Sequence, residues 1–321
     1  MEYDVTALGE LLIDFTPSGT GSQGNPLLEQ NPGGAPCNVL ALLANYKRKV
    51  GFIGKIGDDF HGKFLEQAIK EAGIDGAGLV VSGDVHTTLA FVHIDGSGDR
   101  TFSFCRCPGA DMALTADEVN LEMIRHSRIF HFGTLSMTHE GVRNATKRAA
   151  ECAKESGCLI SFDPNLRPPL WSDMEEARTQ MLYGASVCHV LKIEEDELRF
   201  MTRMEHEAEA VRSIQETCGV PLILVTAGAG GSRAYWGNES QRADAFLTDR
   251  TVDTTGAGDT FCGYCLNYLL DHPIETLDRN QVREMLTGAS AAASIVTTRK
   301  GALKSMPLPE EVEAVVKRQQ Y

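Results

Sequence analysis

The chain has 321 residues, 42% apolar and 23% charged, which is the composition of an ordinary soluble globular protein with a sizeable core. Its 44 acidic and 30 basic residues give a net charge of −14, which argues against a surface for nucleic acids or anionic membranes. Acids near the N-terminus stand where a signal peptide needs Lys or Arg, and no 18-residue apolar run occurs, so a cytoplasmic protein is expected.

Strand-like and helix-like segments then alternate along the chain. Residues 5–15 are apolar and β-rich, and apolar residues recur at helical spacing over 60–72. Four further short apolar runs predict strands buried on both faces, at 129–132, 158–162, 187–193 and 222–226. This alternation predicts an α/β domain over residues 1–321, with helices on both faces of a mostly parallel sheet.

Two stretches interrupt that alternation. Residues 16–32 are rich in Gly, Pro, Ser and Asn and show no period, whereas 87–107 has the pattern of two alternating strands around a Gly-rich turn. A hairpin inserted in an α/β domain has exposed faces unless it covers something. We therefore predict a small discontinuous β lid, from about 15–32 and 86–108, whose two usable faces also permit a homodimer.

The segment DTTGAGD at 253–259 carries the strongest chemical signal. It follows a strand-like stretch at 250–252 and opens an apolar helical run, so its small residues leave backbone N–H groups open at a helix N-terminus, where anions bind. Asp259, one turn from such an anion, has the position of a base that takes a proton from an attacking hydroxyl. An acid is also favourable in the first turn of any helix, and the spacing alone leaves both interpretations open.

Several long motifs resemble, in order, those of the ribokinase-like (PfkB) carbohydrate kinases. PGGAPCN at 32–38 is similar to the first family signature, and DTTGAGD at 253–259 to the second. Segments most similar to fructokinases are LGELLIDF at 8–15, FIGKIGDDFHG at 52–62, FSFCRCPGAD at 102–111, FDPNLRPPLW at 162–171 and LKIEEDEL at 191–198. The resemblance covers essentially the whole chain. It implies a ribokinase-like three-layer α/β/α sandwich that transfers the γ-phosphoryl group of ATP to a sugar, with the 6-hydroxyl of fructose as the leading acceptor.

The same resemblance implies roles for single residues. Asp259 would be the catalytic base, with the N–H groups of Gly256, Ala257 and Gly258 as an anion hole. Contacts to the sugar are implied at Asp14, Gly33, Gly34, Asn38, Arg106, Asn165 and Arg167. The alternatives are a solvent-facing strand-end acid for Asp14, which would end the first strand, a surface charge on the lid for Arg106, and an ion pair between elements for Arg167.

On the nucleotide side the resemblance implies ATP contacts at Lys192, Thr226, Gly228, Gly231 and Ser290. Glu195 matches an acid that organises Mg²⁺ through water, although the acidic run 194–197 also fits a solvated helix start. Asp253 and Thr255 match a site for a monovalent cation, K⁺. The expected partners are therefore a small sugar and ATP, with no nucleic acid and no membrane.

Three other functions compete with this one. A related kinase of the same family would have the same catalytic residues but would act on 2-keto-3-deoxygluconate, ribose or aminoimidazole riboside. A fructokinase-like protein without activity would serve as a regulator. A dinucleotide-binding enzyme would need GxGxxG directly after the first strand, where this chain has a Pro- and Gly-containing stretch instead.

Overall fold

The computed structural model describes residues 1–94 and 100–319, and a nine-stranded sheet forms its centre. The strands lie in the order β13-β12-β11-β10-β9-β8-β1-β4-β5, and all neighbours from β11 to β5 pair in parallel. Only β12 and β13 add antiparallel pairs, at one edge. The bounds are β1 (Tyr3–Leu8), β4 (Val50–Gly57), β5 (Asp75–Ser82), β8 (Ser127–Gly133), β9 (Leu159–Asp163), β10 (Val190–Glu194), β11 (Leu222–Thr226), β12 (Ser232–Trp236) and β13 (Glu239–Ala243).

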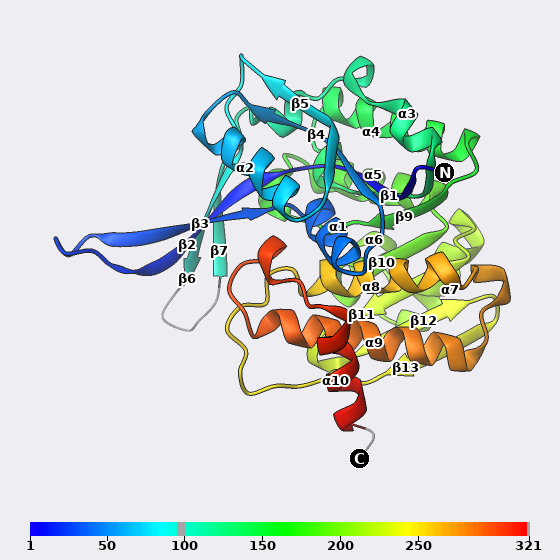
Figure 1. Cartoon of the computed structure of the whole chain (residues 1–321). Helices are drawn as coiled ribbons and strands as arrows, with labels where there is room; N and C mark the ends of the chain where they lie inside the picture. Colours follow the sequence, from blue (N-terminus) through cyan, green and yellow to red (C-terminus); the bar gives the residue numbers. More distant parts are fainter. Residues whose placement is uncertain (95–99, 320–321) are drawn as a thin grey trace.

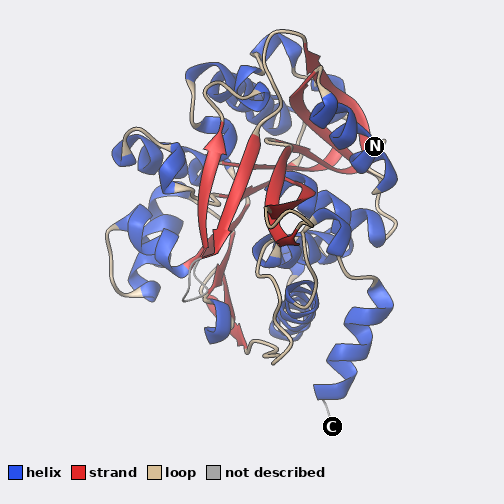
Figure 2. Cartoon of the chain, turned by 90° about the vertical axis from the view of Figure 1, so that its left-hand side faces the viewer, coloured by secondary structure: helices blue, strands red, loops and turns tan. Residues whose placement is uncertain are grey.

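Helices cover both faces of this sheet, which confirms the predicted α/β class (Figure 2). They are α1 (Ala35–Asn45), α2 (Phe60–Glu71), α3 (Leu121–Arg125), α4 (Glu140–Glu155), α5 (Met174–Val187), α6 (Glu195–Thr202), α7 (Glu207–Cys218), α8 (Ala257–Asp271), α9 (Arg279–Thr297) and α10 (Pro309–Gln319). Side chains alternate between the faces, so Leu222 and Leu224 of β11 join one apolar core while Ile223 joins the other. No helix in the described ranges is long and apolar enough to span a membrane.

A separate four-stranded sheet projects from the body and corresponds to the predicted lid (Figure 1). Its order is β3-β2-β6-β7, with bounds β2 (Leu12–Thr20), β3 (Pro26–Gly33), β6 (Leu89–Ile94) and β7 (Arg100–Cys105). The stretch 16–32, predicted to be aperiodic, belongs mostly to the antiparallel pair β2–β3. The predicted Gly-rich turn between β6 and β7 lies outside the described residues.

Two strand predictions are wrong. Residues 5–15 do not form one strand, because the chain leaves the central sheet after Leu8 and enters the lid at Leu12. The Gly9 N–H still donates to the carbonyl of Ile53 in the central sheet (3.1 Å), whereas the Ile13 N–H donates to Thr88 in the lid (3.2 Å). Asp14 therefore lies within a lid strand and does not end the first strand.

The predicted strand at 250–252 is instead part of the long loop between β13 and α8. There the Val252 N–H donates to the carbonyl of Thr297, at the end of α9, over 2.8 Å. This hydrogen bond fixes the loop against the end of α9, shortly before the chain reaches the N-terminus of α8.

Candidate active site

Two cavities meet at the N-terminus of α8. The lid cavity, about 300 Å³, lies beneath the lid and is lined by residues of β2, β7, α1 and the start of α8. The loop cavity, about 480 Å³, lies between the loop that follows β11 and the helices α8 and α9. Glu194, Thr254 and Gly258 line both cavities. Ligands bound in the two cavities would therefore meet at this helix end, at the carboxyl edge of the sheet, where α/β proteins bind ligands.

Asp259 lies in the first turn of α8, where it lines the lid cavity. Its carboxylate oxygen Oδ2 accepts a hydrogen bond of 2.7 Å from Nδ2 of Asn38. Burial raises the pKa of Asp259 to about 6, although the hydrogen bond from Asn38 lowers it. Such a carboxylate is largely ionised at neutral pH and is a stronger proton acceptor than an ordinary aspartate.

Asn38 offers a second group to the lid cavity. Its side-chain oxygen Oδ1 is buried and has no hydrogen-bond partner within residues 1–94 and 100–319. Buried amide oxygens are normally paired, because leaving one unpaired costs about 1–3 kcal/mol. The orphaned oxygen next to Asp259 is therefore an acceptor suited to a ligand hydroxyl.

The turn before α8 is suited to an anion. Gly256 is the N-cap residue, with a left-handed φ of 80°, and α8 starts at Ala257. A Cβ on Gly258 would come within 2.9 Å of the Nζ atom of Lys192, so the absence of a side chain lets this ammonium approach the turn. A helix N-terminus and a nearby cation together make a binding site for phosphate groups.

Two cationic side chains line the lid cavity, Lys192 and Arg167. Lys192 is buried with its Nζ 3.1 Å from Oδ2 of Asp163. Burial alone would lower the pKa of Lys192, but the carboxylates of Asp163, Glu197 and Glu194 raise it above its usual range, so the side chain stays charged. Arg167 makes no ion pair with any described residue, so the alternative of an ion pair between elements is wrong.

The lid contributes an acid to the same cavity. Asp14 extends from β2 into the lid cavity, and burial raises its pKa to about 7 against the lowering effect of Arg167. Gly33, at the end of β3, lies beside it: a Cβ there would come within 2.6 Å of Oδ2 of Asp14. The predicted alternative for Asp14, an acid facing solvent at a strand end, is therefore wrong.

Two further predicted residues line the lid cavity in unusual backbone conformations. Gly34 is the N-cap residue of α1 with a φ of 128°, and a Cβ there would lie 2.3 Å from the carbonyl oxygen of Glu10. Asn165 follows β9 with a left-handed φ of 46°. A non-glycine residue held in this region is strained, and such strain is concentrated at functional sites.

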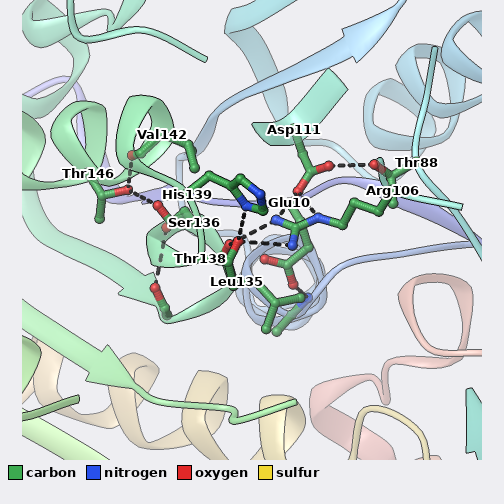
Figure 3. A network of polar contacts seen from close by, with 12 residues as sticks. Glu10, Thr88, Arg106, Asp111, Leu135, Ser136, Thr138, His139, Val142 and Thr146 are labelled. Atoms are coloured by element: carbon green, nitrogen blue, oxygen red, sulfur yellow. Dashed lines mark hydrogen bonds and ion pairs between the residues drawn. The ribbon is translucent and has the colours of Figure 1, made fainter. Parts of the chain in front are cut away.

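Arg106 does not line either cavity. Its guanidinium is buried, and its Nε donates to Oδ2 of Asp111 at 2.8 Å (Figure 3). The two terminal nitrogens donate to Thr138 at 3.0 Å and to the carbonyl of Leu135 at 2.9 Å. The alternative of a surface charge on the lid is therefore wrong. The predicted direct contact with the sugar has no support from either cavity, because Arg106 instead links the base of β7 to the body.

Glu195 also lies away from both cavities, and its carboxylate pairs with Arg199 one turn along α6. Glu194 is the N-cap residue of α6 at the end of β10, and it lines both cavities. The predicted acid, Glu195, and the acid that lines the cavities, Glu194, are neighbours in the chain. Because α6 begins at Glu195, this side chain pairs with Arg199 on the helix. Across the described chain no three His, Cys, Asp or Glu side chains gather as a metal centre.

The loop cavity contains four of the five residues predicted to contact ATP, Thr226, Gly228, Gly231 and Ser290. The fifth, Lys192, lines the lid cavity instead. Ala257 and the apolar side chains of Phe246 and Leu247 also line it. Asp253 and Thr255 belong to the turn before α8, where Oδ1 of Asp253 accepts the Thr255 N–H at 2.8 Å. Of this pair, only Thr255 lines a cavity, the lid cavity.

Two residues missed by the sequence analysis also line these cavities, Glu10 and Glu194. Glu10 is buried between β1 and β2, and its Oε1 accepts the Ala35 N–H at the start of α1 over 2.7 Å. Glu10 stands in an apolar run that the sequence analysis treated as one strand. It could have been identified only by predicting that the strand ends at Leu8.

A larger cavity, about 730 Å³, lies at the opposite end of β11, between α7 and the turn joining β12 to β13. It contains none of the predicted site residues. We therefore assign the active site to the two cavities at α8.

A mostly parallel sheet with a β lid, and two cavities that meet at a helix N-terminus suited to an anion, fit an α/β enzyme that acts on two substrates, one of them anionic. Residues 3–309 match the family model described as pfkB family carbohydrate kinase, so the chain belongs to that family and is a carbohydrate kinase. Fructokinase-1 of Zea mays is 39% identical over 316 residues, covering 98% of each chain.

Solved structures agree with this assignment. Fructokinase from Xylella fastidiosa with bound ATP superposes with a TM-score of 0.91 at 30% identity, covering 99% of this chain and all of that one. A double-mutant fructokinase from Vibrio cholerae O395, with fructose, ADP and a potassium ion bound, has a TM-score of 0.88 at 27% identity, covering 98% of this chain and 99% of that one.

Proposed function

We propose that this protein is an ATP-dependent fructokinase that phosphorylates the 6-hydroxyl of fructose. The observation that carries the proposal is the buried Asp259, hydrogen-bonded to Asn38, at the junction of the lid and loop cavities. Fructose would bind in the lid cavity and ATP in the loop cavity, with its γ-phosphoryl group at the N-terminus of α8. The fructokinase names of the similar proteins support the choice of sugar.

The reaction then follows from the positions of these groups. Asp259 takes the proton of the 6-hydroxyl, and the hydroxyl oxygen bonds to the γ-phosphorus as the bond to the β–γ bridging oxygen breaks. ADP leaves with the electron pair of that bond. The N–H groups of Gly256, Ala257 and Gly258 stabilise the charge that develops, an effect worth roughly 10²–10³ in rate for one donor.

The remaining lid-cavity residues would bind and orient the sugar. Asn38 accepts a hydroxyl hydrogen bond at Oδ1, and Asp14 accepts others from the lid. Gly33 and Gly34 leave room for the sugar, and the strained Asn165 brings an amide to it. Arg167 and Lys192 would offset the negative charge of the phosphates.

We propose that Mg²⁺ binds where the cavities meet, with Glu194, which lines both cavities, in place of Glu195 as the acid that holds it through water. The ion would neutralise phosphate charge, and it suits a site with few protein ligands because it keeps several waters. We further propose Asp253 and Thr255 beside a K⁺ site, supported by the potassium ion in the similar Vibrio structure.

Two wider aspects belong to the same proposal. Leu27 and Leu28 of β3 are 49% and 46% exposed, which supports a homodimer formed through the lid. All nine cysteines are free thiols, which supports a cytoplasmic location, where thiols stay reduced.

A coupled assay of ADP release tests the proposal. Fructose, ribose, 2-keto-3-deoxygluconate and aminoimidazole riboside would each be offered with MgATP, and we expect the highest kcat/KM for fructose. A higher value for another sugar would move the chain to a sister branch of the family. No turnover with any of them would favour the regulatory alternative.

A further inference from the structure

Glu10 is a buried carboxyl group that the proposed mechanism does not use. Only 4% of the residue is exposed, yet it lines the lid cavity together with Asp14, Asn38 and Asp259. It lies where the chain crosses from β1 to the lid strand β2. A carboxylate in such a place is costly unless its oxygens find donors.

The carboxylate of Glu10 accepts a hydrogen bond from the start of α1. Oε1 accepts the N–H of Ala35 at 2.7 Å, in the first turn of α1, whose N-cap residue Gly34 has no side chain to offer. The positive end of the α1 dipole favours a negative charge there. The backbone of α1 thus fixes the orientation of the carboxylate.

Arg106 and Asp111 lie close enough to act on the charge of Glu10 (Figure 3). Burial raises the pKa of Glu10 to about 7, to which Asp111 adds, whereas its own backbone N–H, the Ala35 N–H and Arg106 lower it. Arg106 is in turn fixed by Asp111 and by the carbonyl of Leu135, another residue that lines the lid cavity. Glu10, which lines the lid cavity, is therefore held in place by its contact with α1.

A helix cap alone does not require this arrangement. Helix α2 is capped by Asp59, and α9 by Asp278, each from the residue directly before the helix. For α1 the cap comes from 25 positions upstream, on a side chain that also lines a ligand cavity. Glu10 thus differs from these two caps because it also lines a cavity that a ligand can enter.

We propose that Glu10 contacts the sugar and determines specificity: its carboxylate accepts a hydrogen bond from a hydroxyl other than the one that Asp259 deprotonates. Arg106 is then a positioning residue, which acts through Glu10 and Leu135. This inference rests on the proposed function, since it needs a polyhydroxyl substrate in the lid cavity. A sugar lacking that hydroxyl would leave a buried carboxylate oxygen without its donor and would be rejected.

The test begins with Glu10→Gln, which can keep the acceptor for the Ala35 N–H but presents an NH₂ donor to the sugar. We expect KM for fructose to rise at least about tenfold, while KM for ATP stays within about twofold. Glu118→Gln is the matched control, because Glu118 also accepts a backbone N–H, from Thr115 at 2.9 Å, and lines neither cavity. Its sugar kinetics should match the wild type.

The decisive arm uses fructose analogues that each lack one hydroxyl other than the 6-hydroxyl. One analogue should lose kcat/KM by about tenfold or more in the wild type and lose almost nothing further in Glu10→Gln, because the two changes remove the same hydrogen bond. Equal losses in both enzymes for every analogue, or an unchanged KM for fructose, would overturn the inference.

Two precautions keep the outcome decisive. If Glu10→Gln does not fold, Glu10→Asp replaces it, because it keeps the charge but withdraws the carboxylate from the cavity and should lose the same selectivity. If the wild type does not phosphorylate fructose, the proposed function fails on its own. The analogue series is then built on the sugar with the highest kcat/KM, where the same coupling is expected.

Discussion

The two cavities that meet at α8 are built from different groups. Charged side chains line the lid cavity, most of them buried or half-buried, and they come from the lid and its connection to β1, from β10, from the segment after β9 and from the start of α8. Glycine, alanine, serine and threonine line most of the loop cavity, where Glu194 is the only charged residue among the described lining. A sugar offers many directional hydroxyls and therefore needs fixed acceptors. A nucleotide can be held by shape and by backbone groups, so single substitutions should have larger effects in the lid cavity.

The largest effect is expected at the point where the cavities meet. Asp259→Asn should lower kcat by about 10²–10⁴, because the amide cannot take the hydroxyl proton, while KM for ATP and the melting temperature change little. Asp271→Asn, an exposed change at the other end of α8, is the control and should keep full activity. An Asp259→Asn enzyme within about tenfold of wild-type kcat would mean that another group is the base.

The next effect separates the cavities from each other. Asp14→Ala should raise KM for the sugar by about 10² and leave KM for ATP nearly unchanged, because its carboxylate lines only the lid cavity. Glu29→Ala, on the neighbouring lid strand β3, removes an exposed acid and should alter neither constant. Parallel increases in both KM values would show that the two cavities are not independent.

The smallest effect is expected in the loop cavity. Ser290→Ala removes a hydroxyl that lies 3.4 Å from the hydroxyl of Ser232. A neutral hydrogen bond is worth about 1 kcal/mol, so KM for ATP should rise by at most about fivefold, with no change in KM for the sugar. A loss as large as that of Asp14→Ala would contradict the difference drawn between the cavities.

The sequence predicted the loop cavity better than the lid cavity, for a physical reason. Thr226, Gly228 and Gly231 lie in one loop directly after a strand, so local sequence identifies them together. The lid cavity depends instead on contacts between distant segments. The partners of Arg106 at Leu135 and Thr138 lie about thirty residues away, and no local pattern shows that its charge is buried.

Two other errors have local causes. Glu10 lies within a run that is apolar on both sides of the point where the chain leaves the central sheet, so the pattern gave no sign of a break there. The choice between Glu194 and Glu195 depends on which residue is the N-cap of α6. In a run of acidic residues the sequence cannot determine at which residue the helix begins. The α/β class and the parallel sheet were predictable, because they depend on alternation over the whole chain.

The most direct test of the account is the pH dependence of the phosphoryl-transfer step in single turnovers with sugar and ATP saturating. The pKa values of Glu10 and Asp14 are also raised, and saturation removes the effect of their protonation on sugar binding. The base must be unprotonated, and burial already raises the pKa of Asp259 to about 6 in the ligand-free protein, so the rate should fall as the pH drops, approaching a tenfold loss per pH unit on the acid side. The same slope should be absent from Asp259→Asn. A rate independent of pH between about 5 and 8 in the wild type, or an unchanged slope in Asp259→Asn, would contradict the assignment of Asp259 as the base.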